Sequence, residues 1–371
     1  MPLREIVTGL FVKDADRFIY APIPPGQVVG GQADTGALVA GRDYFRIWLS
    51  EMSLRRDRAW FTTWHPAVHS LVSFQFGQQI IDLPNIAGQQ RLDGVDPAHL
   101  NRSIQLNYKL TPLMPFSGGV VELDIALLAM KGEDYLKRFI GVLNNFAGLL
   151  AVPQLSAVLS VAAPVATGIT ELLGSTNGEM HLGLHQSYVQ KDSGQNELKP
   201  GYYAAVLATE KQVPPASLCV VNDRLRRGSV KGKNVPFDGY AYLLLRIQKE
   251  TKRDDWEGLT SIMQPFGAAI AALGDGRPDV ARTCYGTAIA EVIKSPDLTQ
   301  ADRQRVSRTL FKRFESAREL GLGATATWPS FAKQIAEIPV DEALAAGEPE
   351  LAEFLPRDSA GWSPSGLAES G

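Results

Sequence analysis

The spacing of apolar and polar residues divides the chain into a strand-rich first part and a helix-rich last part. Residues 103–110 alternate strictly, with Ile104, Leu106 and Tyr108 on the apolar side. Strict alternation is typical of a half-buried strand. Similar patterns occur at 45–54, 72–76, 120–130, 180–189, 202–208, 218–223 and 240–248. Because no regularly alternating helices separate these segments, they predict an antiparallel β-sandwich within an α+β protein.

An uncharged stretch interrupts the strand pattern, since residues 139–170 contain no acidic or basic side chain. Its apolar residues recur at helical spacing, and Pro153 suits the first turn of a second helix. The pattern predicts an apolar helical hairpin at about 134–173, inserted between two strands. Its apolar side includes Phe139, Leu143, Phe146, Leu155, Leu159 and Ile169.

Three interpretations of this hairpin are open. Its second face carries small residues such as Ser156 and Ser160, which let another backbone approach closely. The hairpin then packs into the protein's own core or a dimer interface. Alternatively, it is masked at rest and enters a membrane after a trigger, or it lines an apolar ligand cleft. Asn144, Asn145 and Pro153 interrupt the run and argue against one straight transmembrane span.

Helical periodicity replaces alternation after residue 250. The segments 256–273 and 277–294 read as helices joined by a glycine-rich turn, and a third helix follows Thr299. The Thr299 hydroxyl is placed to cap that helix, with Asp302 three residues on as in a capping box. We therefore expect a helical domain at 251–339, after a β-sandwich-like domain at 1–250.

The last segment, 340–371, has a different composition. It carries seven acidic residues against one base, Arg357, together with repeated Pro, Gly and Ser. Such segments cannot bury enough apolar surface to offset the entropy of ordering. The sequence predicts a disordered acidic tail.

Overall composition narrows the classes of function. The chain has 371 residues, 45% of them hydrophobic, and a formal net charge of -3. This is an average globular composition, and a dedicated nucleic-acid binder would be more basic. Two cysteines are too few for a disulfide framework and indicate a reducing compartment. The N-terminus lacks a secretory pattern, so we expect a cytoplasmic protein.

Histidines give the strongest hint of metal or catalytic chemistry. They form two pairs spaced four residues apart, His65 with His69 and His181 with His185. Both pairs lie in strand-like contexts, where four residues span about 13 Å, too far for one shared ion. The sequence therefore predicts no metal and no cofactor. An ion held across strands by one histidine from each pair is the alternative.

A pair of carboxylates supports a second enzymatic alternative. Glu122 and Asp124 fall on one face of a strand, about 7 Å apart, a separation found in glycoside hydrolases. A hydrolase would combine them with His65, His69 or His181. No nucleophile motif accompanies these residues, so we predict no catalytic residue.

Two basic segments are candidates for binding a partner. Residues 224–233, RLRRGSVKGK, carry five cations and no acid between two strand candidates. The third helix has basic residues around an apolar stripe. Each has the charge of a solvated surface and can also attract an acidic partner. The residues concerned are Arg226, Arg227, Lys231, Arg305, Arg308 and Lys312.

These patterns favour a non-enzymatic protein–protein interaction protein, that is, a scaffold, an adaptor or a conditional effector. Its expected partner is another protein, with a membrane as partner after a trigger and no sequence-specific nucleic acid. Two alternatives belong to other classes: a membrane-active effector that exposes the hairpin at 134–173, and a hydrolase with a histidine and carboxylate site.

Overall fold

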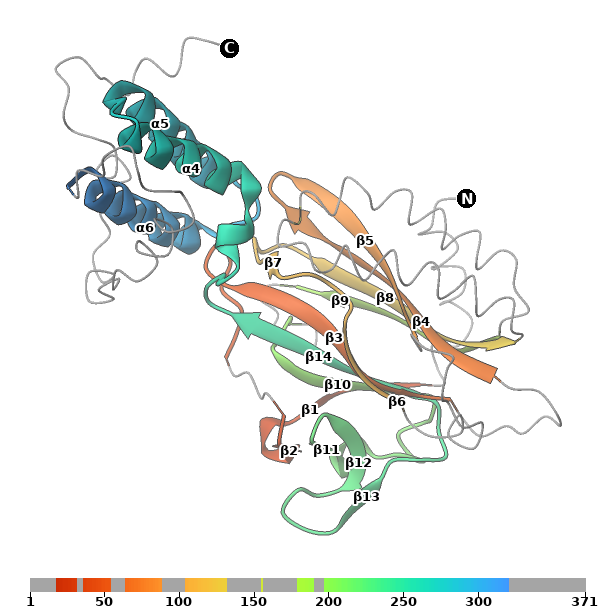
Figure 1. The fold of residues 1–371 in the computed structure, drawn as a ribbon. Coiled ribbons are helices and arrows are strands. Elements are labelled where there is room, and N and C mark those ends of the chain that lie inside the picture. Colours follow the sequence, from red (N-terminus) through yellow and green to blue (C-terminus); the bar gives the residue numbers. More distant parts are fainter. Residues whose placement is uncertain are drawn as a thin grey trace. The chain divides into compact units, whose positions relative to one another are not determined.

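The computed structural model describes residues 18–31, 36–54, 64–88, 104–131, 155, 179–189 and 197–319 (Figure 1). The chain divides into two compact units, Met1–Arg253 and Asp254–Gly371. Every described strand lies in the first unit, and helices α4, α5 and α6 lie in the second. The predicted α+β class, with mostly antiparallel sheets and C-terminal helices, is confirmed.

Sheet A is the largest sheet, and all its strand pairs are antiparallel. Its strands in spatial order are β1 (Ile19–Ile23), β10 (Gly201–Val206), β14 (Tyr242–Glu250), β3 (Tyr44–Ser53) and β6 (Ile104–Lys109), and the short β7 (Met114–Pro115) also pairs with β3. Strands from both ends of the first unit are therefore neighbours in this sheet.

Sheet C is a second antiparallel sheet, with the order β5 (Gln79–Gly88), β4 (Trp64–Phe76), β8 (Val121–Lys131) and β9 (Glu179–Tyr188). One hydrophobic cluster draws buried side chains from sheets A and C, among them Ile47 and Leu245 from sheet A and Leu123 and Leu184 from sheet C. The two sheets therefore share a core, which supplies most of the hydrophobic stabilisation of this unit.

Asn85 connects sheets C and A through a buried hydrogen bond. It lies on β5 and is 1% exposed, and its Nδ2 donates to the Leu110 carbonyl at 2.5 Å. Leu110 directly follows β6 of sheet A. A buried carbonyl that loses its donor costs about 1–3 kcal/mol.

We expect Asn85→Ala to lower the free energy of unfolding by about 1–3 kcal/mol, because the Leu110 carbonyl would stay buried without this donor. Urea denaturation measures the change. Gln79→Ala, at an exposed position on the same strand, is the control. Equal stability of the two variants would show that Asn85 does not link the sheets.

Sheet B is small and covers part of the other face of sheet A (Figure 1). Its order is β13 (Asn234–Pro236), β12 (Arg224–Gly228), β11 (Leu218–Val221) and β2 (Val28–Val29), and only the β2–β11 pair is parallel. The short helices η2 (Pro25–Gln27) and η4 (Pro215–Ser217) precede β2 and β11. A second cluster, which includes Ala204, Leu244 and Leu225, lies between sheets A and B.

The start of the basic segment is itself a strand, although the sequence places the segment between two strand candidates. Residues Arg224–Gly228 form a strand, because Asn222 and Asp223 adopt positive φ angles of 52° and 61°. Two consecutive residues with positive φ form a type I′ turn, whose backbone twist matches that of the two flanking strands. Sequence patterning misses this strand because three of its five residues are arginines.

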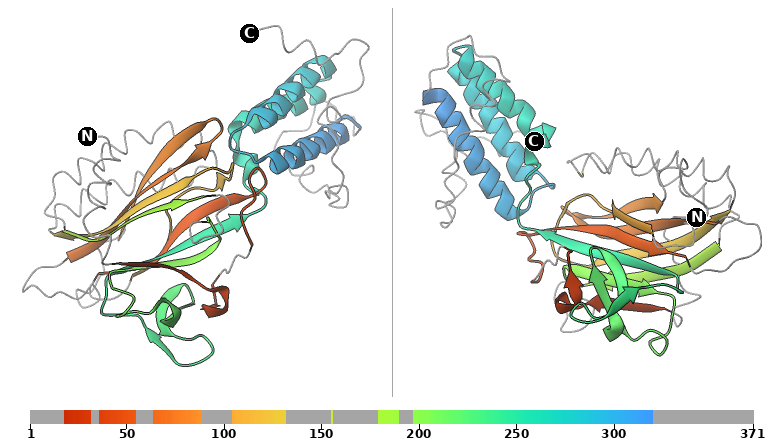
Figure 2. Two further views of the ribbon diagram at one scale, coloured as in Figure 1. Left: turned by 180° about the vertical axis from the view of Figure 1, so that it is seen from behind. Right: turned by 60° about the horizontal axis from the view of Figure 1, so that its bottom comes forward.

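The second unit contains η5 (Trp256–Gly258), α4 (Thr260–Gly274), α5 (Pro278–Lys294) and α6 (Gln300–Glu319). Figure 2 shows the three α-helices running side by side, and their buried faces form one cluster in which Tyr285 stacks on Phe314. The predicted cap of α6 is confirmed, since the Thr299 hydroxyl accepts from the Asp302 amide at 3.2 Å.

Most of the predicted hairpin and the whole predicted tail at 340–371 lie outside the described residues. Leu155 is the one residue of 134–173 that the structure describes. It is fully buried and belongs to the cluster shared by sheets A and C.

Candidate functional site

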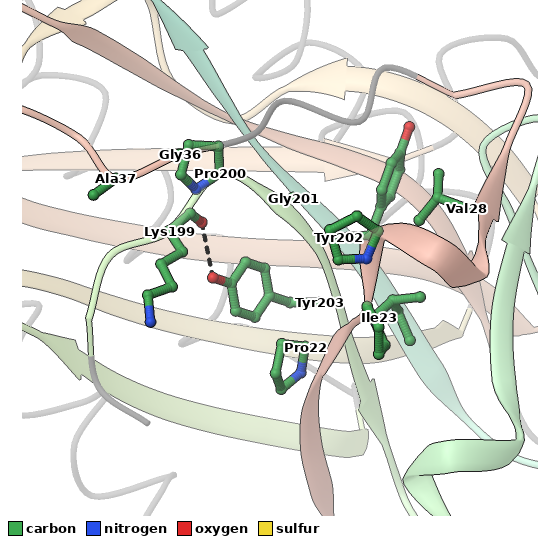
Figure 3. Close-up of a pocket in the computed structure, with 12 residues that line it drawn as sticks. Pro22, Ile23, Val28, Gly36, Ala37, Lys199, Pro200, Gly201, Tyr202 and Tyr203 are labelled. Carbon is green, nitrogen blue, oxygen red and sulfur yellow. Dashed lines mark hydrogen bonds between the residues drawn. The ribbon is translucent and has the colours of Figure 1, made fainter. Parts of the chain in front are cut away.

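A cavity of about 310 Å³ opens where β1 ends and β10 begins (Figure 3). The antiparallel pairing of Ile23 with Tyr202 brings these two ends together. Rings make up much of the cavity wall, namely those of Pro22, Pro24, Pro25, Pro200, Tyr202 and Tyr203. We call this cavity the Pro–Tyr pocket.

The two tyrosines are fixed in position from opposite faces of sheet A. They are consecutive strand residues, so their rings point in opposite directions (Figure 3). The Tyr203 hydroxyl donates to the Lys199 carbonyl at 2.8 Å, and its ring stacks on Tyr20 with centroids 5.5 Å apart. The Tyr202 hydroxyl donates to Asp223. Both tyrosine side chains of the pocket wall are therefore held by hydrogen bonds from within the protein.

Burial also keeps these hydroxyls neutral. It raises the pKa of Tyr203 to about 12, and it raises the pKa of Tyr202 further, with the hydrogen bond to Asp223 acting in the same direction. Neither group is a base at neutral pH. The tyrosines therefore offer apolar ring surface and hydroxyls that are already hydrogen-bonded.

The prolines form the accessible part of the pocket. Pro22, Pro24 and Pro25 are all exposed. A proline ring loses almost no side-chain entropy when it is buried, and it has no backbone N–H that would need a partner. Such a surface favours apolar rings and prolyl residues as ligands.

The residues of the predicted hydrolase do not all meet. His69 lies on β4 and is 2% exposed, while the side chain of His65 lies outside the described residues. Asp124 instead pairs with His185, whose Nδ1 lies 2.6 Å from Asp124 Oδ1. Asp124 is 3% exposed, so a buried carboxylate orients a half-exposed imidazole. Sequence spacing did not identify this pair because the two residues meet only through the β8–β9 register.

The Asp124–His185 pair has the geometry of the orienting half of a Ser-His-Asp triad. Among the described residues, no serine, threonine or cysteine side chain hydrogen-bonds to His185. Within the same ranges, no three His, Cys, Asp or Glu side chains are grouped as metal ligands would be. Glu122 lies beside this pair on β8, opposite Ser187 of β9.

The basic residues predicted to bind a partner fall into two separate groups. In the first unit, Arg226 Nε donates to Asn234 Oδ1 at 2.6 Å, and Arg227 and the turn residue Lys231 are exposed. In the second unit, Arg305 on α6 pairs with Asp302 at 2.6 Å, while Arg308 and Lys312 on the same helix are half-buried.

Of the residues predicted for an apolar interface or membrane hairpin, only Leu155 is described. The others, Phe139, Leu143, Phe146, Leu159 and Ile169, lie outside the described residues.

Comparison with family models, with curated proteins and with solved structures found no match. In the described ranges, no helix combines the length and the hydropathy that a membrane crossing requires.

Sequence reasoning missed the Pro–Tyr pocket. Pro24-Pro25-Gly26 reads as a turn, and the segment at 199–203 lies about 175 residues further along the chain. The adjacent tyrosines Tyr202 and Tyr203, which the structure buries, and the exposed Pro24 and Pro25 were the available signal, because aromatic residues are enriched at interfaces.

Proposed function

We propose that this chain is a non-enzymatic protein-binding protein, a scaffold, adaptor or conditional effector, which holds a partner's apolar or prolyl residue in the Pro–Tyr pocket. The observation that carries the proposal is the set of exposed proline rings around two fixed tyrosines. Aromatic-lined grooves that bind extended proline-containing peptides use the same chemistry.

The size of the pocket supports a peptide side chain as the ligand. Its volume of about 310 Å³ is at the lower end of the range for small-molecule sites. Few polar groups converge in it, since Lys199 is the one charged residue of the lining described. Proline and tyrosine side chains lose little conformational entropy when a ligand buries them.

We further propose that sheets A and C form a β-sandwich, with the segment between β8 and β9 inserted as the helical hairpin. The shared cluster supports the first part, and the burial of Leu155 in that cluster supports the second. In this arrangement the hairpin contributes apolar side chains to the shared core. The pocket lies at the β1 edge of sheet A, where a partner can reach it.

Selection of random peptides displayed on phage tests the proposed function on the full chain. We expect enrichment of peptides that contain proline or a large apolar residue. Ala37→Trp would fill the pocket, since Ala37 lines it and is exposed, and should weaken binding of the selected peptides about tenfold or more. Ala216→Trp, at an exposed alanine outside the lining, is the matched control.

Two results would contradict the proposed function. One is the absence of any enriched peptide. The other is equal binding of the selected peptides by Ala37→Trp and Ala216→Trp, measured by fluorescence titration after both variants are shown to be folded by circular dichroism.

A further inference from the structure

One side of the Pro–Tyr pocket comes from a segment without regular secondary structure. Gly36 and Ala37 line the pocket (Figure 3), and they begin a stretch of turns and irregular backbone at 36–43. Most of the other lining residues lie in β1, β2 or β10, where ladder hydrogen bonds hold the backbone. We call residues 36–43 the 36–43 loop. Its position at the pocket depends on contacts other than a strand ladder.

Lys249, on β14 of sheet A, supplies such a contact. Its Nζ donates to the Ala37 carbonyl at 2.8 Å and lies 3.0 Å from Asp43 Oδ2. The same oxygen of Asp43 accepts from the Val39 amide at 2.8 Å. One ammonium and one carboxylate therefore connect both ends of the 36–43 loop to a central strand of the sheet.

Burial makes this ion pair more than a surface contact. Asp43 is fully buried, and the side chain of Lys249 is 19% exposed. Arg42 also lies near the carboxylate, but it is 3.9 Å away and its side chain is 66% exposed. Exposed pairs contribute little to stability, whereas a buried charge depends strongly on its partner. Lys249 is therefore closer to Asp43 and better shielded from water than Arg42.

Other contacts hold the rest of the loop independently of Lys249. The Gly41 amide donates to the Phe116 carbonyl at 2.7 Å, and Leu38 belongs to the cluster shared by sheets A and C. Lys249 adds the contact at Ala37, the residue that lines the pocket. We expect loss of this contact to loosen the loop at the pocket while the other end stays attached.

We propose that Lys249, paired with Asp43, fixes the position of Ala37 and thereby determines which side chain fits the Pro–Tyr pocket. This inference rests on the proposed function. Lys249 is a positioning residue, because it acts on the ligand through the Ala37 backbone. A fixed wall discriminates between side chains of different shape, whereas a loose wall adapts to several of them. A fixed wall also costs less entropy when the ligand binds.

The test measures how well the full chain discriminates between ligands. One selected peptide is made in four forms, with Pro, Leu, Phe or Trp at the residue that alanine replacement shows to be essential for binding. For the wild type, we expect about a tenfold difference in Kd between the best and the poorest form. Lys249→Met removes the donor and keeps the length of the side chain. This variant should bind the best form about fivefold more weakly and reduce the difference between forms to about threefold or less.

A second variant guards against misfolding. Lys249→Met leaves the Asp43 carboxylate buried without this cation, which lowers stability. Combining Lys249→Met with Asp43→Asn removes both charges, and the asparagine oxygen can still accept from the Val39 amide. The double variant should show the same reduced discrimination as Lys249→Met.

Asn85→Ala is the matched control, because it is expected to lower stability and Asn85 does not line the pocket. This variant should keep the wild-type difference between the four forms. Loss of discrimination in Asn85→Ala would mean that destabilisation alone alters the pocket, and would overturn the inference.

The remaining outcomes separate the inference from the proposed function. If the selected peptides bind but the wild type does not discriminate between the four forms, or if both Lys249 variants keep the wild-type difference, the inference is overturned and the proposed function stands. If the selection enriches no peptide, both are overturned.

Discussion

Leu155→Ala is expected to lower the free energy of unfolding by about 3 kcal/mol, the usual cost of truncating a fully buried leucine. Leu155 is 0% exposed and contributes to the cluster between sheets A and C. Its removal leaves a cavity that the surrounding strands cannot fill. Denaturation by urea, followed by circular dichroism, measures the change.

The control for Leu155 is an apolar residue outside any cluster. Ile80 is 78% exposed, and Ile80→Ala should change stability by less than about 0.5 kcal/mol. If Leu155→Ala were as stable as Ile80→Ala, the side chain of Leu155 would not contribute to the core. That result would favour the alternative in which residues 134–173 form a membrane-active hairpin.

The second large effect concerns acid stability and His69. Burial lowers the pKa of this imidazole from 6.5 to about 4, and among the described residues its Nε2 has no hydrogen-bond partner. Between these two pH values the unfolded chain binds a proton that the folded chain excludes. Stability therefore falls as the pH drops from 6.5 to 4, by about 3 kcal/mol in total.

We expect His69→Leu to remove this part of the acid sensitivity. Its neighbours across β4 are Ile86 and Ala126, so an apolar side chain of similar size fits the site. The measurement is the free energy of unfolding of wild type and variant at several pH values from neutral to acid. Parallel curves for the two proteins would show that His69 titrates normally in the folded state.

The sequence predicts the strands that have at least one apolar face and misses strands interrupted by polar residues or proline. β3, β8 and β9 have clear patterns because one or both of their faces are apolar. β5 is missed because it contains Asp82, Pro84 and Asn85, and Asn85 faces the core as a hydrogen-bond donor rather than as an apolar residue. A polar residue in a core satisfies its hydrogen bonds through tertiary contacts, which local patterning does not contain.

The helical part is predicted more closely, since its signals are local. The Thr299 cap and the glycine-rich turn before Pro278 act within a few residues of the helix ends that they define. The Pro–Tyr pocket and the Asp124–His185 pair each depend on strand register instead. Register joins residues from distant parts of the chain, so no local spacing indicates which of them meet.

Pro22 lies within β1, at the edge of sheet A among the described strands. Proline cannot donate a ladder hydrogen bond, and sheets tolerate it at such an edge. A partner that binds beside β1 therefore has little opportunity to join the sheet as another strand, and must be recognised by its side chains. Backbone ladders impose an N-to-C direction on a bound peptide, whereas contacts between rings do not. Different partners are thus able to present the same few side chains on chains that run in opposite directions.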